Sequence, residues 1–133
     1  MSFTFDTNTL ISATLWDGSV SQKLLHQCIK RADSIYTSKE ILNEYQEVLK
    51  RDFDYSDEDI AKIMEKISQF VTIIEPKIKL SVVENDPDDD MIVECAVESK
   101  SQYIISYNKH LLKLKEYENI KVIRPDEAMK ILD

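Results

Sequence analysis

The sequence comprises 133 residues, and its 25 acidic and 17 basic side chains give a formal charge of −8. Gly18 is the only glycine, which excludes glycine-rich phosphate loops, the dinucleotide-binding turn and the glycine-flanked nucleophile elbow. The acidic balance also argues against broad non-specific binding of nucleic acids, although it leaves room for a local basic groove.

Composition predicts one folded domain over residues 1–133, because 43% of the residues are hydrophobic and 32% are charged. No apolar run approaches the roughly 18 residues of a membrane span. The start of the sequence also lacks a basic segment followed by an apolar one, so we expect a cytoplasmic protein. Cys28 and Cys95 lie in apolar helical patterns without a CxxC pair, which predicts reduced core residues.

Strand and helix patterns alternate along the chain. Short apolar runs predict strands at residues 3–6, 34–37, 71–75, 103–106 and 121–124. Apolar residues at helical spacing predict helices around residues 10–15, 20–29, 41–49, 60–70, 91–96 and 109–114, with a closing helix that begins at Pro125. Ser38, Ser56 and Asp88 are the expected N-caps. This alternation predicts an α/β fold, a three-layer α/β/α sandwich with a central parallel sheet of four to five strands.

Polar residues follow three of the predicted strands, at positions 6–8, 37–38 and 106–108. In parallel sheets, ligands bind beyond the carboxyl ends of the strands, where the strand order reverses. Asp6 has an alternative role as an N-cap, but Thr7, Asn8 and Thr9 can all serve as caps. We therefore expect the Asp6 carboxylate to take part in a site.

Two further groups of acids point to the same kind of site. Glu44 borders the apolar stripe of its helix, either as a simple boundary residue or facing a cleft, whereas Glu40 and Glu47 lie opposite that stripe. Five acids fall within residues 84–90, immediately before a helix, and the helix N-terminus accounts for about two of them. Without histidine or cysteine ligands, such carboxylates predict a site for Mg²⁺ or Mn²⁺.

Five motifs occur in a characteristic order: FDTNTLISA, SKEILNEYQEVL, DPDDDMIVECA, YIISYNKHLL and IRPDEAM. Along nearly its whole length the chain resembles PIN-domain proteins, and within them the VapC-like toxin components of toxin–antitoxin systems. The resemblance implies a PIN-like fold and an Mg²⁺- or Mn²⁺-dependent ribonuclease that cleaves RNA to leave a 3′-hydroxyl and a 5′-phosphate. It also implies two protein partners, an antitoxin and a second copy of the chain in a homodimer.

The resemblance assigns roles to individual residues by the motifs in which they lie. The catalytic carboxylates and metal ligands would be Asp6, Glu44 and Asp90, with Asp86, Asp89 and Asn108 as further metal ligands. Thr7, Asn8 and Ser106 would orient ligands or waters around them. The family commonly has an aspartate where this chain has Asn108, so the neutral amide predicts a weaker metal site. Tyr107 stands where a small residue is common and would narrow the cleft.

Candidate RNA contacts lie in a basic part of the chain, because residues 99–124 hold six basic and two acidic side chains. Lys109, His110 and Lys113 would meet RNA phosphates there, or else form a solvated helix face.

Two other classes of function stay open. In one, the neutral Asn108 leaves a catalytically weakened PIN-like binding module that acts through a protein partner. The other is a phospho-accepting receiver domain, which needs a lysine at the end of a late strand. The last predicted strand ends at Arg124 and Pro125 instead, which disfavours this class.

Overall fold

The computed structural model describes residues 1–84 and 86–132. The strands are β1 (Ser2–Phe5), β2 (Ser34–Ser38), β3 (Thr72–Ile74), β4 (Tyr103–Ile105), β5 (Glu116–Tyr117) and β6 (Ile120–Ile123). The helices are α1 (Thr7–Leu15), α2 (Val20–Arg31), α3 (Lys39–Asp52), α4 (Asp57–Ser68), α5 (Asp90–Ser99), α6 (Lys109–Leu114) and α7 (Pro125–Leu132), with a 3₁₀ turn, η1 (Pro87–Asp89).

The strands form one six-stranded sheet in the order β3-β2-β1-β4-β6-β5. All neighbouring pairs are parallel except β5 and β6, where Glu116 pairs with Lys121 in an antiparallel hairpin. The strand order reverses between β1 and β4, since β2 and β3 lie on one side and β4 and β6 on the other. The predicted α/β sandwich is confirmed. The sixth strand was missed because β5 has only two residues, too few to show a periodic pattern.

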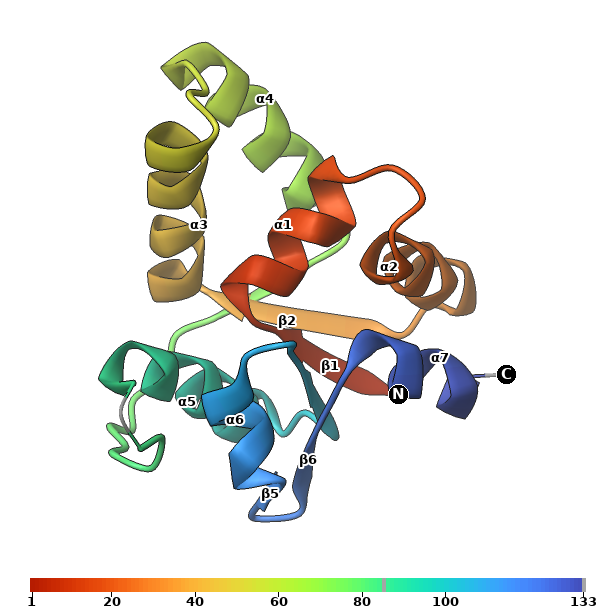
Figure 1. The fold of residues 1–133 in the computed structure, drawn as a ribbon, viewed down its shortest axis with the longest axis vertical. Coiled ribbons are helices and arrows are strands. Elements are labelled where there is room, and N and C mark those ends of the chain that lie inside the picture. Colours follow the sequence, from red (N-terminus) through yellow and green to blue (C-terminus); the bar gives the residue numbers. More distant parts are fainter. Residues whose placement is uncertain (85, 133) are drawn as a thin grey trace.

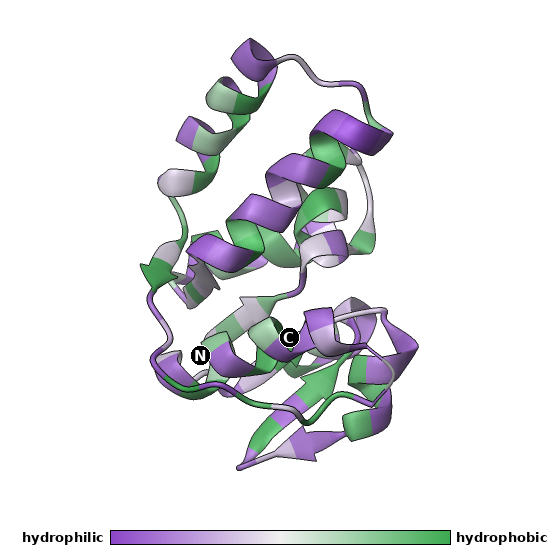
Figure 2. Ribbon diagram, turned by 90° about the vertical axis from the view of Figure 1, so that its left-hand side faces the viewer, coloured by the Kyte–Doolittle hydropathy of each residue, from purple (hydrophilic) through white to green (hydrophobic). Residues whose placement is uncertain are grey.

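Helices cover both faces of the sheet (Figure 1). Helices α1, α2 and α7 pack on one face, where Phe3, Phe5 and Ile105 enter the larger core cluster. Helices α5 and α6 pack on the other face over Ile104 and Val122. The neighbours Ile104 and Ile105 face opposite sides because side chains alternate along a strand. Figure 2 shows green and purple residues alternating along the long helices, as expected of amphipathic helices.

The N-caps show how local sequence sets the helix boundaries. Ser38 accepts a hydrogen bond from the Ile41 amide, and Ser56 forms a capping box with Asp59, so both predicted caps are confirmed. The predicted Asp88 cap is wrong, because Pro87 already begins the η1 turn and α5 begins only at Asp90. An N-cap residue needs an extended backbone, which Asp88 lacks inside that turn.

Gly18 lies in the turn between α1 and α2 with a φ of +80°, a conformation that L-residues rarely adopt. Cys28 and Cys95 are buried and free, as predicted. Within residues 1–84 and 86–132, no helix combines the length and the hydrophobicity that a membrane crossing requires.

Candidate functional site

Asp6 lies directly after β1, at the point where the strand order reverses. Its Oδ1 atom accepts a hydrogen bond of 2.8 Å from the Thr9 amide, so Asp6 itself is the N-cap of α1. The alternative role of Asp6 as an N-cap is therefore confirmed, although Thr7, Asn8 and Thr9 could also have served as caps. Burial raises the pKa of the Asp6 carboxyl, and hydrogen bonds from Ser106 and Thr9 oppose that rise.

Ser106 joins the first and fourth strands at this edge of the sheet. Its hydroxyl donates a hydrogen bond to Asp6 Oδ2 and accepts one of 2.8 Å from the Asn108 amide. The side chain is fully buried, and the Ser106 amide donates to the Ile123 carbonyl of β6 at 3.0 Å. Ser106 therefore holds the second oxygen of Asp6 in place from a neighbouring strand.

Glu44 approaches the same place from α3. Its carboxyl is half-buried, and burial raises its pKa, with the charges of Asp88, Asp6 and Asp86 adding to the rise. The nearby Thr7 hydroxyl opposes the rise, although it lies outside ordinary hydrogen-bond geometry. Glu44 therefore lies near other acids, and the interpretation in which it faces a cleft stays a prediction.

Glu40 and Glu47, on the same helix as Glu44, are exposed to solvent, as the helical periodicity predicts. They differ from Glu44 in environment and not in side-chain chemistry, which makes them natural reference positions.

Asp86 and Asp89 bring the acidic turn before α5 toward these carboxylates. The pKa of Asp89 is raised to about 8, first by burial, then by a hydrogen bond shared with the Asp86 carboxyl and by the charges of Asp86, Asp6 and Glu44. Asp89 Oδ2 is buried and has no hydrogen-bond partner among residues 1–84 and 86–132. A buried carboxylate oxygen without a partner is costly, and a cation is one way to relieve that cost.

Asp90 makes backbone contacts that the sequence did not predict. Its Oδ1 atom accepts hydrogen bonds of 2.9 Å from both the Val82 and the Val83 amides. Consecutive helical side chains point about 100° apart, so Asp89 and Asp90 cannot face the same point. The charges that raise the pKa of Glu44 are those of Asp88, Asp6 and Asp86, and those that raise the pKa of Asp89 are those of Asp86, Asp6 and Glu44. The assignment of Asp90 as a catalytic metal ligand stays a prediction.

Asn108 likewise uses the atom that was expected to face an ion. Its Oδ1 accepts hydrogen bonds from the His110 amide at 2.8 Å and the Leu111 amide at 3.4 Å, which caps α6. Asn8 is exposed beside the cluster, whereas Thr7 is buried within it.

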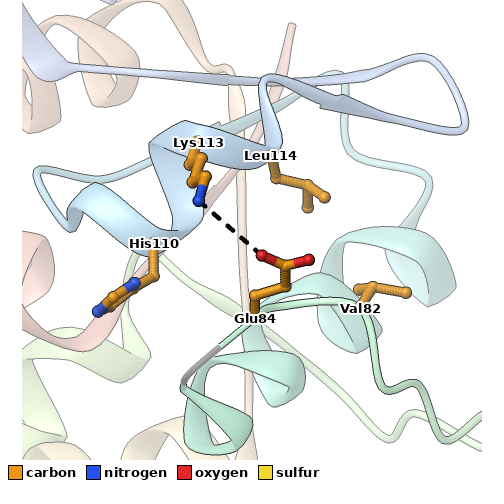
Figure 3. A pocket seen from close by; sticks show the side chains of 5 residues that line it. All are labelled: Val82, Glu84, His110, Lys113 and Leu114. Atoms are coloured by element: carbon orange, nitrogen blue, oxygen red, sulfur yellow. Dashed lines mark ion pairs between the residues drawn. The ribbon is translucent and has the colours of Figure 1, made fainter.

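The basic residues of α6 lie beside a small pocket of about 240 Å³. Figure 3 shows His110 and Lys113 on the helix and Glu84 on the facing loop, with Lys113 pointing toward the glutamate. Lys113 Nζ is 3.9 Å from Glu84 Oε2, and both side chains are exposed, so this ion pair is weak. Lys109 is exposed at the start of the helix.

An exposed apolar groove of about 530 Å³ has Asn8, two positions after Asp6, among its lining residues. Trp16, Phe53 and Tyr107 contribute aromatic rings to it. Tyr107 forms one wall, with the Arg124 guanidinium 5.3 Å from its ring centroid. The sequence did not predict this groove, because its residues come from four separate segments.

Chemically, the cluster of Asp6, Glu44, Asp86 and Asp89 offers oxygen donors only, which suits a hard divalent cation. The mutual repulsion of these carboxyls and the unpartnered Asp89 oxygen also fit such an ion. As they stand, no three histidine, cysteine, aspartate or glutamate side chains of the described residues are grouped tightly enough to hold a metal ion.

Comparison with known proteins adds two findings. A family model for the PIN domain matches residues 2–110. The fold is similar to a chain in the crystal structure of VapBC2 from Rickettsia felis bound to a DNA fragment from their promoter, with a TM-score of 0.66 and 16% sequence identity. That similarity covers 93% of this chain and 98% of the other. A search of curated proteins found no match.

Proposed function

The chain belongs to the PIN domain family, and we propose that it is a ribonuclease that hydrolyses RNA phosphodiesters with the help of Mg²⁺ or Mn²⁺. One observation carries the proposal: Asp6, Glu44 and Asp89 come from three separate segments and lie near one another beyond the carboxyl end of β1. Burial raises the pKa of all three, the charge of Asp6 adds to the rise at Glu44, and the charges of Asp6 and Glu44 add to the rise at Asp89. Folded proteins seldom gather buried carboxyls without a partner cation or a chemical use.

Asp6, Glu44, Asp86 and Asp89 would hold the ion. When bound, the ion would lower the pKa of a water and neutralise charge that develops on the phosphodiester. This ligand set prefers Asp89 to Asp90, because Asp89 Oδ2 has no hydrogen-bond partner among the described residues, whereas Asp90 Oδ1 accepts from the Val82 and Val83 amides.

The chain's own hydrogen bonds orient these carboxylates. Ser106 and the Thr9 amide fix the two oxygens of Asp6, so that its carboxylate has one orientation before any ion arrives. Thr7 lies next to Glu44 and opposes the rise of its pKa, which keeps this glutamate readier to ionise. Such supporting contacts commonly raise the affinity of carboxylate sites for metals.

RNA would approach along the basic side of the site. Lys109 and His110 begin α6 immediately after Asn108, and Lys113 follows one turn later. We propose that these side chains contact phosphates, with Lys113 exchanging its weak ion pair with Glu84 for the RNA backbone.

A protein partner is the second part of the proposal. The groove at Trp16, Phe53 and Tyr107 exposes aromatic surface beside an acidic cluster, so it suits a segment with apolar side chains next to a basic one. An antitoxin is the partner that we propose, since the similar structure is of a VapBC2 complex. The homodimer expected from the family resemblance stays a prediction.

The ribonuclease proposal is tested by a matched pair of variants on α3. Glu44→Gln should reduce Mn²⁺-dependent cleavage of single-stranded RNA by at least about 100-fold, since it removes a charged ligand. Glu47→Gln makes the same chemical change on the exposed side of the helix and should leave the rate unchanged. Equal rates for the two variants would contradict the proposal.

Asn108 favours one alternative, a binding module that holds a cation without cleaving RNA. Because residue 108 is an asparagine, the site has no carboxylate at this position, and the Asn108 Oδ1 atom accepts a hydrogen bond from the His110 amide. Isothermal titration of the wild-type protein with Mn²⁺, combined with the cleavage assay, separates the two functions. Binding without any cleavage would support the module, and binding with cleavage would support the enzyme.

A further inference from the structure

Three acids of α5 lie on one face of the helix, at intervals of four residues: Asp90, Glu94 and Glu98. Each accepts hydrogen bonds from the backbone of one preceding segment, residues 77–83. Glu98 Oε1 accepts from the Lys77 amide, Glu94 Oε2 from the Leu80 amide, and Asp90 Oδ1 from the Val82 and Val83 amides, all at 2.9 Å. We call this set of contacts the α5 latch.

The carboxylates of the α5 latch accept the backbone hydrogen bonds that a neighbouring strand would otherwise accept. Residues 77–81 have no regular secondary structure, and without pairing their amides would lose hydrogen bonds on approaching the helix. Carboxylates are strong acceptors for such amides. Asp90 and Glu94 are each 7% exposed, so water does little to weaken their bonds. Lys79 adds a longer contact, with its Nζ 3.9 Å from Glu94 Oε1.

Packing reinforces the same attachment. Val83 is 6% exposed and belongs to the core cluster that also contains Ile92 and Val93 of α5. The segment is therefore held to α5 by apolar contact at Val83 and by carboxylates along its length.

The latched segment leads directly into the proposed metal ligands. Asp86 is three positions after Val83 in the sequence. The η1 turn follows, and Asp89 is its last residue, immediately before α5. The Val83 amide donates a hydrogen bond to Asp90 Oδ1, and this bond joins the two ends of the loop that runs from Val83 to Asp90. A change at Asp90 or Glu94 would free one end of the loop that bears Asp86 and Asp89.

We propose that Asp90 and Glu94 are positioning residues, which hold the loop bearing Asp86 and Asp89 in the conformation that binds the divalent cation. They act as hydrogen-bond acceptors for the backbone and contact neither cation nor RNA. This inference rests on the proposed function for its consequence, but the latch itself is a property of the chain.

The test uses pairs of variants that separate an acceptor from a charge. An amide oxygen still accepts hydrogen bonds, so Asp90→Asn and Glu94→Gln should keep the latch, whereas Asp90→Ala and Glu94→Ala should open it. Titration calorimetry with Mn²⁺ should show affinity weakened roughly tenfold in each alanine variant and by less than about threefold in each amide variant. Glu40→Ala, at an exposed position on α3, is the control.

Amide hydrogen exchange of the metal-free protein tests the α5 latch independently of metal binding. The Val82 and Val83 amides should exchange faster in metal-free Asp90→Ala than in Asp90→Asn, while the amides of β1 and β4 stay protected in both. Equal exchange in all variants would overturn the latch, even if the wild type bound no Mn²⁺ and the proposed function failed. Loss of Mn²⁺ affinity in Asp90→Asn as severe as in Asp90→Ala would overturn the positioning role and make Asp90 a direct ligand.

Discussion

Asp6 combines a structural and a chemical role in one side chain. Its Oδ1 caps α1 through the Thr9 amide, and its Oδ2 accepts from Ser106, so both oxygens are occupied. A capping carboxylate at the end of a buried strand is also held in one orientation. The contribution of Asp6 to stability is therefore separable from its charge.

Replacing Asp6 with asparagine and with alanine separates the two roles. Asp6→Asn keeps a capping oxygen, so we expect unfolding free energy to change by less than about 1 kcal/mol, while RNA cleavage is lost with the charge. Asp6→Ala removes the cap and leaves Ser106 without its acceptor, which should cost about 2 kcal/mol. Urea denaturation and a cleavage assay measure the two effects. A large loss of stability in Asp6→Asn would contradict this separation.

Asp89 makes stability depend on pH in an unusual direction. Its pKa is raised to about 8 in the folded chain, so between about pH 4 and pH 8 the folded state keeps a proton that the unfolded state releases. The unfolded state then binds fewer protons, and the free energy of unfolding falls as the pH rises through this range.

We therefore expect the metal-free protein to be more stable at pH 5 than at pH 8, and Asp89→Asn to lose most of that difference. Asp33 has a lowered pKa and acts in the opposite sense, so the comparison between wild type and variant is the informative quantity. Urea denaturation in EDTA at both pH values measures it. An identical pH dependence in the two proteins would show that Asp89 is ionised in the folded state.

Sequence alone could place these residues at a site but could not orient them. Asp6 and Glu44 were identified because one ends an apolar strand and the other borders an apolar stripe. Three consecutive aspartates, however, differ only in direction around the start of α5, and that direction depends on the η1 turn that begins at Pro87. The role of Asp90 also depends on the Val82 and Val83 amides, and a backbone donor has no sequence signature.

At the scale of elements, several residues of the proposed site lie at or just before the first residues of helices. Asp6 begins α1, the η1 turn leads into α5, and Asn108 begins α6. Helix N-termini favour negative charge, because their first amides lack partners within the helix. An acid at such a position can accept a hydrogen bond from a helix amide and still present its negative charge to a cation.

Asn108 offers a direct test of that idea. Asn108→Asp should keep the cap on α6, since aspartate and asparagine cap equally well, and should change stability by less than about 0.5 kcal/mol. The second carboxylate oxygen would add negative charge at the site, so we expect Mn²⁺ to bind several-fold more tightly in calorimetry. Unchanged affinity would show that position 108 lies outside the metal site.

Elements were predictable from sequence where one local signal determined them. Ser38 and Ser56 marked helix starts because a hydroxyl cap and an apolar stripe agree there. Asp88 failed because a neighbouring proline determines the backbone before any cap can act. The groove at Trp16, Phe53 and Tyr107 was not predictable, since only the packing of separate segments brings these rings together.

For the whole molecule, the charge of −8 is unevenly distributed. Residues 84–98 hold seven acids and no base, whereas residues 99–124 carry a basic excess. The start of the acidic stretch, with Asp86 and Asp89, lies near Asp6, and α6 of the basic stretch follows the carboxyl end of β4, so acids that suit a cation and a basic helix that suits phosphate share this end of the sheet. An acidic protein can therefore act on RNA without a broadly basic surface.

This distribution predicts how divalent ions affect stability. Simple screening by NaCl relieves general repulsion, whereas a bound ion stabilises the folded state by mass action, by about 2.7 kcal/mol at a concentration 100 times its Kd. At equal ionic strength, we expect Mn²⁺ to raise the Tm of the wild type by several degrees more than NaCl does. Glu44→Gln should lose that extra shift, and Glu47→Gln should keep it. Equal Tm shifts in Mn²⁺ and NaCl for the wild type would mean that the ions only screen the carboxylates and that no specific metal site forms.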